Sequence, residues 1–238
     1  MSEKKLQKYL SQEPSASGQR KPNKIPIILT DSKGKYLQPF CQQGAKSDII
    51  WINKSGKTTD FYVRWLESNV QRISKDGDVH MLIWIGTCDP TTKVGKTITL
   101  KVNQDEVIDN AKKNLTSIKN KIVDSTNNNT ASFLHTPYYS IAKWNEFKGH
   151  PDPQSFLEDD IKLKGTIDSI NSHIDDLNSE LNTYSPKFNA DLEKTRKPKQ
   201  GKTRRSVNFN LYRDGIHPRE ALAKVWLKNI NRLIQQAC

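Results

Sequence analysis

The stretch IPIILTDS at residues 25–32 decides the fold class of this chain of 238 residues. It is a short apolar run that ends abruptly in the polar pair Asp31 and Ser32. Such a run is typical of a strand buried on both faces of a parallel sheet. Active residues collect where parallel strands end, so Ser32 stands at a position that suits a nucleophile.

The rest of the chain alternates between short apolar runs and longer amphipathic stretches. We expect further strands at residues 48–52, 79–85 and 131–135. We expect helices at residues 34–43, 59–74, 104–124, 159–182 and 220–236. This alternation predicts an α/β fold with a central parallel sheet and helices on both of its faces.

The helix expected at residues 159–182 carries one apolar stripe from Leu163 to Leu181. A stripe of this kind fits either a coiled coil or a helix that covers a sheet. Only about three heptads are present, fewer than an isolated coiled coil usually needs. We therefore expect this helix to cover the sheet.

The expected domain spans residues 25–238, with one basic segment before it at residues 1–24 and another within it at residues 194–205. The chain has 38 Lys and Arg and 26 Asp and Glu, a net charge of +12. Residues 1–24 are basic and polar, so we expect a mobile arm. Residues 194–205 predict an exposed loop, whose basic residues are Lys194, Arg196, Lys197, Lys199, Lys202, Arg204 and Arg205. Solvation explains most charge runs, but binding to nucleic acid or another polyanion stays open.

The apolar content of the chain indicates where the protein resides. No stretch approaches the ~18 apolar residues of a transmembrane helix, and residues 1–24 lack the apolar core of a secretory signal. The three cysteines are scattered, which suggests neither a disulfide framework nor a zinc ribbon. We expect a soluble, intracellular protein, and the sequence leaves its oligomeric state open.

A second polar segment, DGIHP at residues 214–218, precedes the last expected helix. A serine acts as a nucleophile when a base removes its proton and a carboxylate orients that base. Asp214 and His217 are three residues apart, so one turn can hold both. Together with Ser32 they supply the three parts of a hydrolytic triad.

Two further segments complete a pattern along the chain. Gly56 follows the second expected strand, and the sequence GTCD at residues 86–89 follows the third. Over roughly residues 25–236, the chain thereby resembles the SGNH hydrolase superfamily, also called GDSL esterases and lipases. Thr30-Asp31-Ser32 stands where the family has Gly-Asp-Ser, and residues 214–218 are the closest match.

The resemblance implies a flavodoxin-like three-layer α/β/α fold and a serine esterase that hydrolyses a small acyl or acetyl ester. Ser32 is then the nucleophile, His217 the base and Asp214 its orienter, and no metal or cofactor is required. The resemblance also assigns an oxyanion hole to the amide of Ser32, the amide of Gly56 and the side chain at position 88.

Position 88 departs from the family because it is Cys88 instead of asparagine. A thiol is a weaker hydrogen-bond donor than a carboxamide. Loss of one such donor lowers turnover by about 100- to 1,000-fold, so two amides can still support slow hydrolysis. Cys88 is not expected to be a nucleophile itself, because Asp89 and Pro90 follow it where a thiolate needs a positive neighbour.

The alternative hypothesis is a binding module without strong catalysis. A weakened SGNH-like domain would bind nucleic acid through the basic segments at residues 1–24 and 194–205. Related esterase-like domains occur in proteins encoded by mobile elements, which suits this alternative.

Two other polar residues are expected to be structural. Asp31 is expected to bond amides near Ser32, and His80 is expected to have its hydrogen bonds satisfied within the sheet.

Overall fold

Four parallel strands form the centre of the protein in a computed structural model that describes residues 1–12, 23–41, 49–125, 128–196 and 204–238. They are β1 (Ile25–Thr30), β2 (Ile50–Asn53), β3 (Val79–Trp84) and β6 (Thr130–Phe133). Their order in the sheet is β2-β1-β3-β6. The predicted parallel sheet is confirmed, and its strands all end at the same edge.

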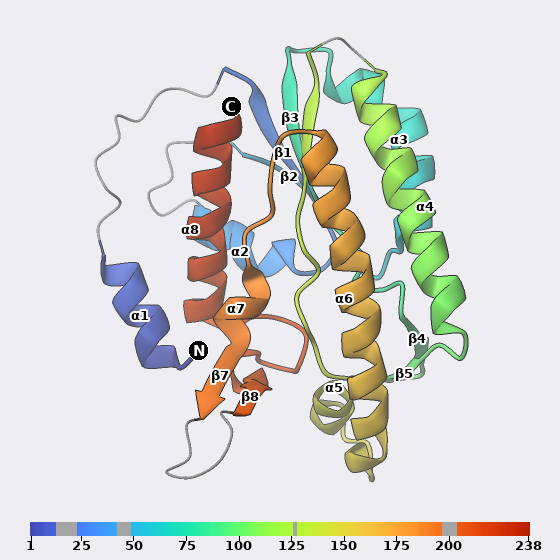
Figure 1. Ribbon diagram of the computed structural model, residues 1–238, viewed down its shortest axis with the longest axis vertical. Helices are drawn as coiled ribbons and strands as arrows, with labels where there is room; N and C mark the ends of the chain where they lie inside the picture. Colours follow the sequence, from blue (N-terminus) through green and yellow to red (C-terminus); the bar gives the residue numbers. More distant parts are fainter. Residues whose placement is uncertain (13–22, 42–48, 126–127, 197–203) are drawn as a thin grey trace.

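Helices cover both faces of this sheet, as Figure 1 shows. On one face lie α2 (Gly34–Cys41) and α8 (Glu220–Ala237), which pack on Ile28, Leu82 and Trp84. On the other face lie α3 (Thr59–Ile73), α4 (Gln104–Val123) and α6 (Leu157–Glu180). These pack on Ile27, Leu29, Met81 and Ile83, because successive strand residues point to opposite faces. The three-layer α/β/α architecture is confirmed.

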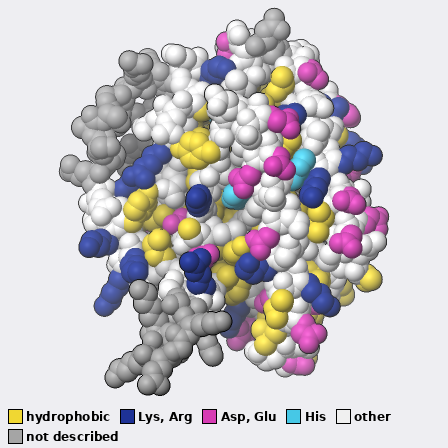
Figure 2. All heavy atoms as spheres, viewed as in Figure 1, with side chains coloured by type: hydrophobic (Ala, Val, Ile, Leu, Met, Phe, Trp, Pro, Cys, Tyr) yellow, Lys and Arg dark blue, Asp and Glu magenta, His cyan; other side chains and the backbone are white. Residues whose placement is uncertain are grey.

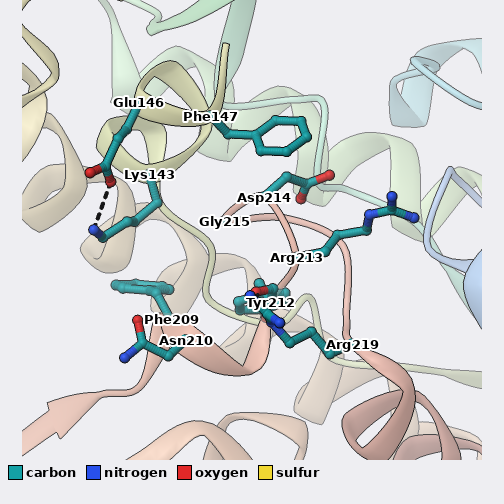
Figure 3. A pocket seen from close by; sticks show the side chains of 10 residues that line it. All are labelled: Lys143, Glu146, Phe147, Phe209, Asn210, Tyr212, Arg213, Asp214, Gly215 and Arg219. Carbon is teal, nitrogen blue, oxygen red and sulfur yellow. Dashed lines mark hydrogen bonds and ion pairs between the residues drawn. The ribbon is translucent and has the colours of Figure 1, made fainter. Parts of the chain in front are cut away.

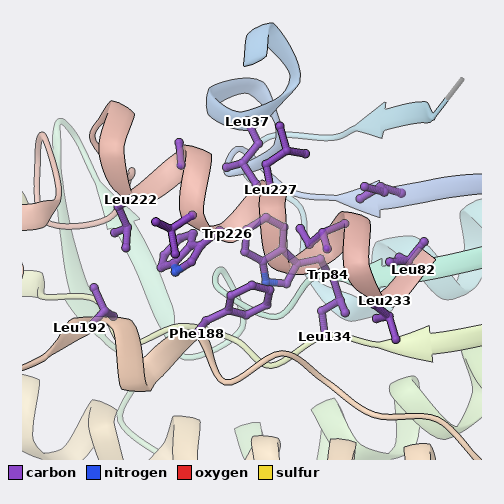
Figure 4. Close-up of a cluster of buried hydrophobic side chains, with 14 of the residues drawn as sticks. Leu37, Leu82, Trp84, Leu134, Phe188, Leu192, Leu222, Trp226, Leu227 and Leu233 are labelled. Carbon is purple, nitrogen blue, oxygen red and sulfur yellow. The ribbon is translucent and has the colours of Figure 1, made fainter. Parts of the chain in front are cut away.

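A cluster of three aromatic rings joins the end of β3 to two neighbouring helices (Figure 4). Trp84 packs against Phe188 of α7 (Phe188–Leu192) at 5.0 Å and edge-on against Trp226 of α8 at 5.7 Å. Phe188 and Trp226 are 5.4 Å apart, so all three ring pairs are in contact. Such pairs add to the stability that burial alone provides. The cluster fixes α8 near the carboxyl ends of the strands.

Helix α6 covers the sheet and also completes the hydrogen bonds of the edge strand β6. The side chain of Asn178 accepts from the Phe133 amide and donates to its carbonyl, each at 2.8 Å. Asn171 makes the same pair of bonds with Thr136, at 2.8 and 3.0 Å. Unpaired backbone groups at a sheet edge would otherwise need water or another strand. The prediction that this helix covers the sheet is confirmed.

The N-terminal segment differs from the expected mobile arm. Residues 3–11 form α1 (Glu3–Ser11), whose Leu6 is completely buried against the α8 side of the core. Tyr9 of α1 donates a 2.6 Å hydrogen bond to Asn229 of α8. Only one residue of α1 is buried, so its sequence lacks the repeating apolar pattern that predicts a helix. Residues 13–22 of the expected arm lie outside the described residues.

The expected basic loop at residues 194–205 also differs in part. Its two ends form an antiparallel hairpin of β7 (Glu193–Arg196) and β8 (Arg204–Val207). Lys194 and Arg205 are exposed there, and residues 197–203 lie outside the described part. Figure 2 shows Asp and Glu side chains gathered over α4 and α6, while Lys and Arg dominate the half of this face around α7 and α8.

Several short elements were not predicted. They are β4 (Thr91–Val94), β5 (Thr97–Leu100), α5 (Ile141–Phe147), and the 3₁₀ turns Pro153–Phe156 and Phe209–Leu211. The Asn145 side chain joins two of them, because it bonds both the amide and the carbonyl of Ile98 at 2.9 Å. Among the described residues, none of the helices has the length and apolar character to cross a membrane.

His80 of β3 is a buried histidine that contacts two hydroxyl groups of β6. It is 2% exposed, and its ring nitrogens lie 2.8 Å from Thr130 Oγ1 and 3.1 Å from Ser132 Oγ. Burial, and to a smaller extent Lys24, lowers its pKa from 6.5 to about 4. The structural role expected for His80 is confirmed, because both of its ring nitrogens are hydrogen-bonded.

We predict that His80 makes the free energy of unfolding fall as pH falls from 6.5 to 4. The unfolded chain binds a proton in this range and the folded protein does not, a difference of about 3 kcal/mol. Asp89 acts in the opposite direction, because burial raises its pKa to about 6. The measurement is therefore urea unfolding of wild type and His80→Gln at pH 7 and pH 4. Equal acid losses in both proteins would contradict the prediction.

Candidate active site

A chain of two hydrogen bonds connects Ser32, at the end of β1, to the turn before α8. His217 Nε2 lies 2.9 Å from Ser32 Oγ, and His217 Nδ1 lies 2.7 Å from Asp214 Oδ2. Asp214 and His217 are buried, whereas Ser32 is half-buried and can be reached from solvent. The structure thus brings together the three residues that the sequence analysis proposed for a triad. Ser32 and His217 are 185 positions apart in the chain.

The Asp214 carboxylate also holds its own turn together. Its Oδ1 accepts hydrogen bonds from the amides of Ile216 at 3.0 Å and His217 at 2.8 Å. Burial by itself would raise the pKa of Asp214, but the bonds and charge of His217 outweigh it and lower the pKa below its usual value. Asp214 therefore stays ionised and can hold the imidazole in one tautomer.

Helix α5 packs directly on this turn and requires glycine at position 215. Gly215 has φ of +91°, and a Cβ there would lie 2.7 Å from Lys143 Cβ and 2.9 Å from the Trp144 amide nitrogen. The Ser140 amide donates to the Gly215 carbonyl at 3.0 Å. The close approach presses the start of α5 against the turn that carries Asp214 and His217.

Two aromatic rings flank the imidazole of His217. The Tyr36 ring of α2 lies 4.5 Å away, and the Trp144 ring of α5 lies 5.8 Å away in an edge-on arrangement. The Arg213 guanidinium lies over the Tyr36 ring, 5.4 Å from its centre. The sequence analysis did not identify Tyr36, since a single tyrosine in a short helix has no distinguishing pattern. Contacts with the two rings restrict rotation of the imidazole.

A buried ion pair lies next to Ser32. Lys33 is 2% exposed, and its Nζ donates to Asp31 Oδ2 at 2.5 Å and to the hydroxyl of Thr87. The same ammonium lies 5.2 Å from the centre of the Trp84 ring. Asp31 Oδ1 accepts the Lys33 amide at 3.0 Å, which confirms the structural role expected for Asp31. Lys33 joins the segment after β1 to the segment after β3.

Gly56 and Cys88 lie next to each other. Burial raises the pKa of the Cys88 thiol to about 12, and a hydrogen bond from the Gly56 amide acts in the opposite direction. The Lys54 amide donates to the Thr30 carbonyl at 2.9 Å, which fastens the loop before Gly56 to the end of β1. Cys88 therefore carries its proton at neutral pH, which disfavours a thiolate nucleophile.

The fold of this chain is similar to the folds of solved structures, although no family model and no curated protein sequence matches it. A GDSL-like lipase from Bacteroides thetaiotaomicron is similar in structure, with TM-score 0.59, 14% identity and full coverage of both chains. The chain has the fold of GDSL-like lipases. The fold that the sequence resemblance implied is thereby confirmed.

Two other solved structures share this SGNH fold. A member of the lipolytic G-D-S-L family from Veillonella parvula matches with TM-score 0.51 and 11% identity, covering 87% of this chain and 96% of its own. The acetyl xylan esterase AlAXEase matches with TM-score 0.52 and 14% identity, covering 87% and 97%. Within the described residues, no group of three or more His, Cys, Asp or Glu is arranged to hold a metal.

We predict that Lys33→Met lowers the free energy of unfolding by about 3 to 5 kcal/mol, because it leaves the buried Asp31 carboxylate without its cation. Urea unfolding at pH 7 measures this loss. The double variant Asp31→Asn with Lys33→Met removes both charges and recovers part of it. Lys164→Met is the control, because Lys164 pairs with Asp168 at the surface and its loss costs about 1 kcal/mol or less. Equal losses for Lys33→Met and Lys164→Met would contradict the prediction.

Proposed function

We propose that this protein is a serine esterase that hydrolyses a small acyl or acetyl ester. The observation that supports this most directly is the hydrogen-bonded chain from Ser32 through His217 to Asp214 at the carboxyl end of a parallel sheet. The same fold occurs in proteins named as a GDSL-like lipase and an acetyl xylan esterase. The proposal rests on this geometry, since a shared fold alone does not fix an activity.

The proposed reaction has two steps. Ser32 Oγ attacks the ester carbonyl while His217 Nε2 accepts its proton, and Asp214 stabilises the resulting imidazolium. The tetrahedral intermediate collapses, the alcohol leaves with the proton from His217, and the acyl group stays on Ser32. Water then attacks this acyl-enzyme with His217 again as base, which releases the acid and restores the serine.

The oxyanion of each intermediate is proposed to lie between the amides of Ser32 and Gly56 and the side chain of Cys88. The Cys88 thiol stays protonated because burial raises its pKa to about 12. It can therefore donate a hydrogen bond, but a weaker one than a carboxamide. The proposed enzyme depends mainly on two backbone amides and is slow for this reason.

We predict that Ser32→Ala lowers the hydrolysis rate of 4-nitrophenyl acetate by about 10⁴-fold or more, because the acyl-enzyme cannot form. The rate of 4-nitrophenol release by purified protein measures it. Ser155→Ala is the control, since the Ser155 hydroxyl only bonds the Asp152 carbonyl at the surface. If Ser32→Ala hydrolysed the ester as fast as wild type, the proposed function would be wrong.

We predict that Cys88→Asn raises kcat by about 10- to 1,000-fold, because a carboxamide supplies the strong donor that the thiol lacks. Steady-state kinetics on the same ester, with thermal unfolding to verify the fold, measures the effect. Cys88→Ala is the control and stays within a few fold of wild type, because it removes only a weak donor. A folded Cys88→Asn protein without a gain in kcat would place position 88 outside the oxyanion hole.

A further inference from the structure

A pocket of about 230 Å³ lies beside the turn that carries Asp214 and Gly215 (Figure 3). In Figure 3, Lys143, Glu146 and Phe147 of α5 lie on one side of the pocket, and Phe209 lies on the other. The segment that leads into α8 closes the pocket and contributes Arg213 and Arg219, together with Asp214 and Gly215 of the turn itself. The pocket and the candidate triad thus share one segment of backbone.

Positive charge predominates in this pocket. Lys143, Arg213 and Arg219 line it, and Glu146 and Asp214 are its acidic residues. Both carboxylates are already engaged, because Glu146 pairs with Lys143 at 2.7 Å and Asp214 pairs with His217. Arg213 is exposed and forms no ion pair with any residue that the structure describes. Its guanidinium is available to an anion from solvent, and its planar shape suits a carboxylate.

Aromatic surface accompanies this charge. Phe147 is 54% exposed, a large fraction for a phenylalanine side chain. Phe209 stacks on Tyr212 at 6.3 Å and presents its ring from the opposite side. Pockets that bind small molecules combine such apolar surface with a few polar groups that fix the orientation of the ligand. The lining therefore suits an organic anion that contains a ring.

The position of the pocket relates it to one half of an ester substrate. In the proposed mechanism, His217 Nε2 gives its proton to the leaving oxygen, so the alcohol part lies on the His217 side of Ser32. The carbonyl oxygen lies on the other side, with Gly56 and Cys88. Arg213 connects the pocket to the His217 side, because its guanidinium lies over the Tyr36 ring that packs on the imidazole.

We propose that this pocket is the subsite for the alcohol part of the ester, and that it favours alcohols that carry an anionic group on a ring. The inference rests on the proposed esterase function and names its substrate class. Arg213 provides the main contact with the anion. Phe147 and Phe209 contact the ring. Glu146 weakens anion binding because it neutralises Lys143.

Two acetyl esters with matched rings test the charge preference. The first is 4-acetoxybenzoate, which carries a carboxylate, and the second is 4-acetoxybenzamide, which is neutral. The quantity measured is kcat/KM for the anionic ester divided by kcat/KM for the neutral one. Comparing this ratio between variants cancels the different reactivities of the two leaving groups.

Two variants should move this ratio in opposite directions. Arg213→Gln lowers it by about 3- to 10-fold, and Glu146→Gln raises it by about 2- to 5-fold because it frees the Lys143 ammonium. Arg64→Gln is the control, since Arg64 lies on α3, pairs with Asp60 and changes the net charge equally. Its ratio equals that of wild type. Added salt lowers the ratio in wild type more than in Arg213→Gln.

An unchanged ratio in both Arg213→Gln and Glu146→Gln, with both esters hydrolysed, overturns the subsite and leaves the esterase function intact. If wild type hydrolyses 4-nitrophenyl acetate but neither of these esters, the subsite is overturned and the esterase function stands. If wild type hydrolyses none of the three esters, the esterase function fails, and the pocket is tested by calorimetry with 4-hydroxybenzoate and 4-hydroxybenzamide. Tighter binding of the anion, weakened at least threefold by Arg213→Gln, supports the anion site. Equal binding of the two compounds, or no binding of either, overturns it.

Discussion

The hydrogen bonds of one buried carboxylate connect the fold to the candidate chemistry. Asp214 bonds two amides of its own turn and the imidazole of His217, so the same group shapes the turn and orients the proposed base. Its position depends on Gly215, where α5 approaches too closely for any side chain. The turn is therefore held from two directions, by the packing of α5 on Gly215 and by its own hydrogen bonds to Asp214.

The opposite half of the site depends on the parallel sheet. β1 and β3 end side by side, which brings Ser32 next to the segment that contains Thr87 and Cys88. The buried pair of Lys33 and Asp31 then joins the two segments through the Thr87 hydroxyl. Removing one partner of a buried charge pair is strongly destabilising, because the other charge is left unpaired. The pair therefore favours the one arrangement of the loops that keeps both charges together. Stability and geometry around Ser32 come from the same contacts.

Much of this organisation is predictable from the sequence. The strand at residues 25–30 and the long helix after residue 104 follow from apolar runs and periodic patterns, which report burial directly. Ser32, His217 and Asp214 follow from local motifs combined with the rule that parallel strands end at one edge. These signals are local in the chain or depend only on topology.

The features that could not be predicted from the sequence arise from contacts between distant segments. A lysine after a serine normally points to solvent, and Lys33 is buried only because Asp31, Thr87 and Trp84 surround it. The helix at residues 3–11 has one buried leucine and depends on α8. The pocket beside Asp214 likewise exists because α5, which was not predicted, packs on the turn before α8. Labelling with a fluorophosphonate probe followed by mass spectrometry decides whether Ser32 is the activated nucleophile that we propose. We expect one adduct, located on Ser32 and absent from His217→Ala, whereas a folded protein that remains unlabelled or reacts at another residue would show that Ser32 is not the nucleophile.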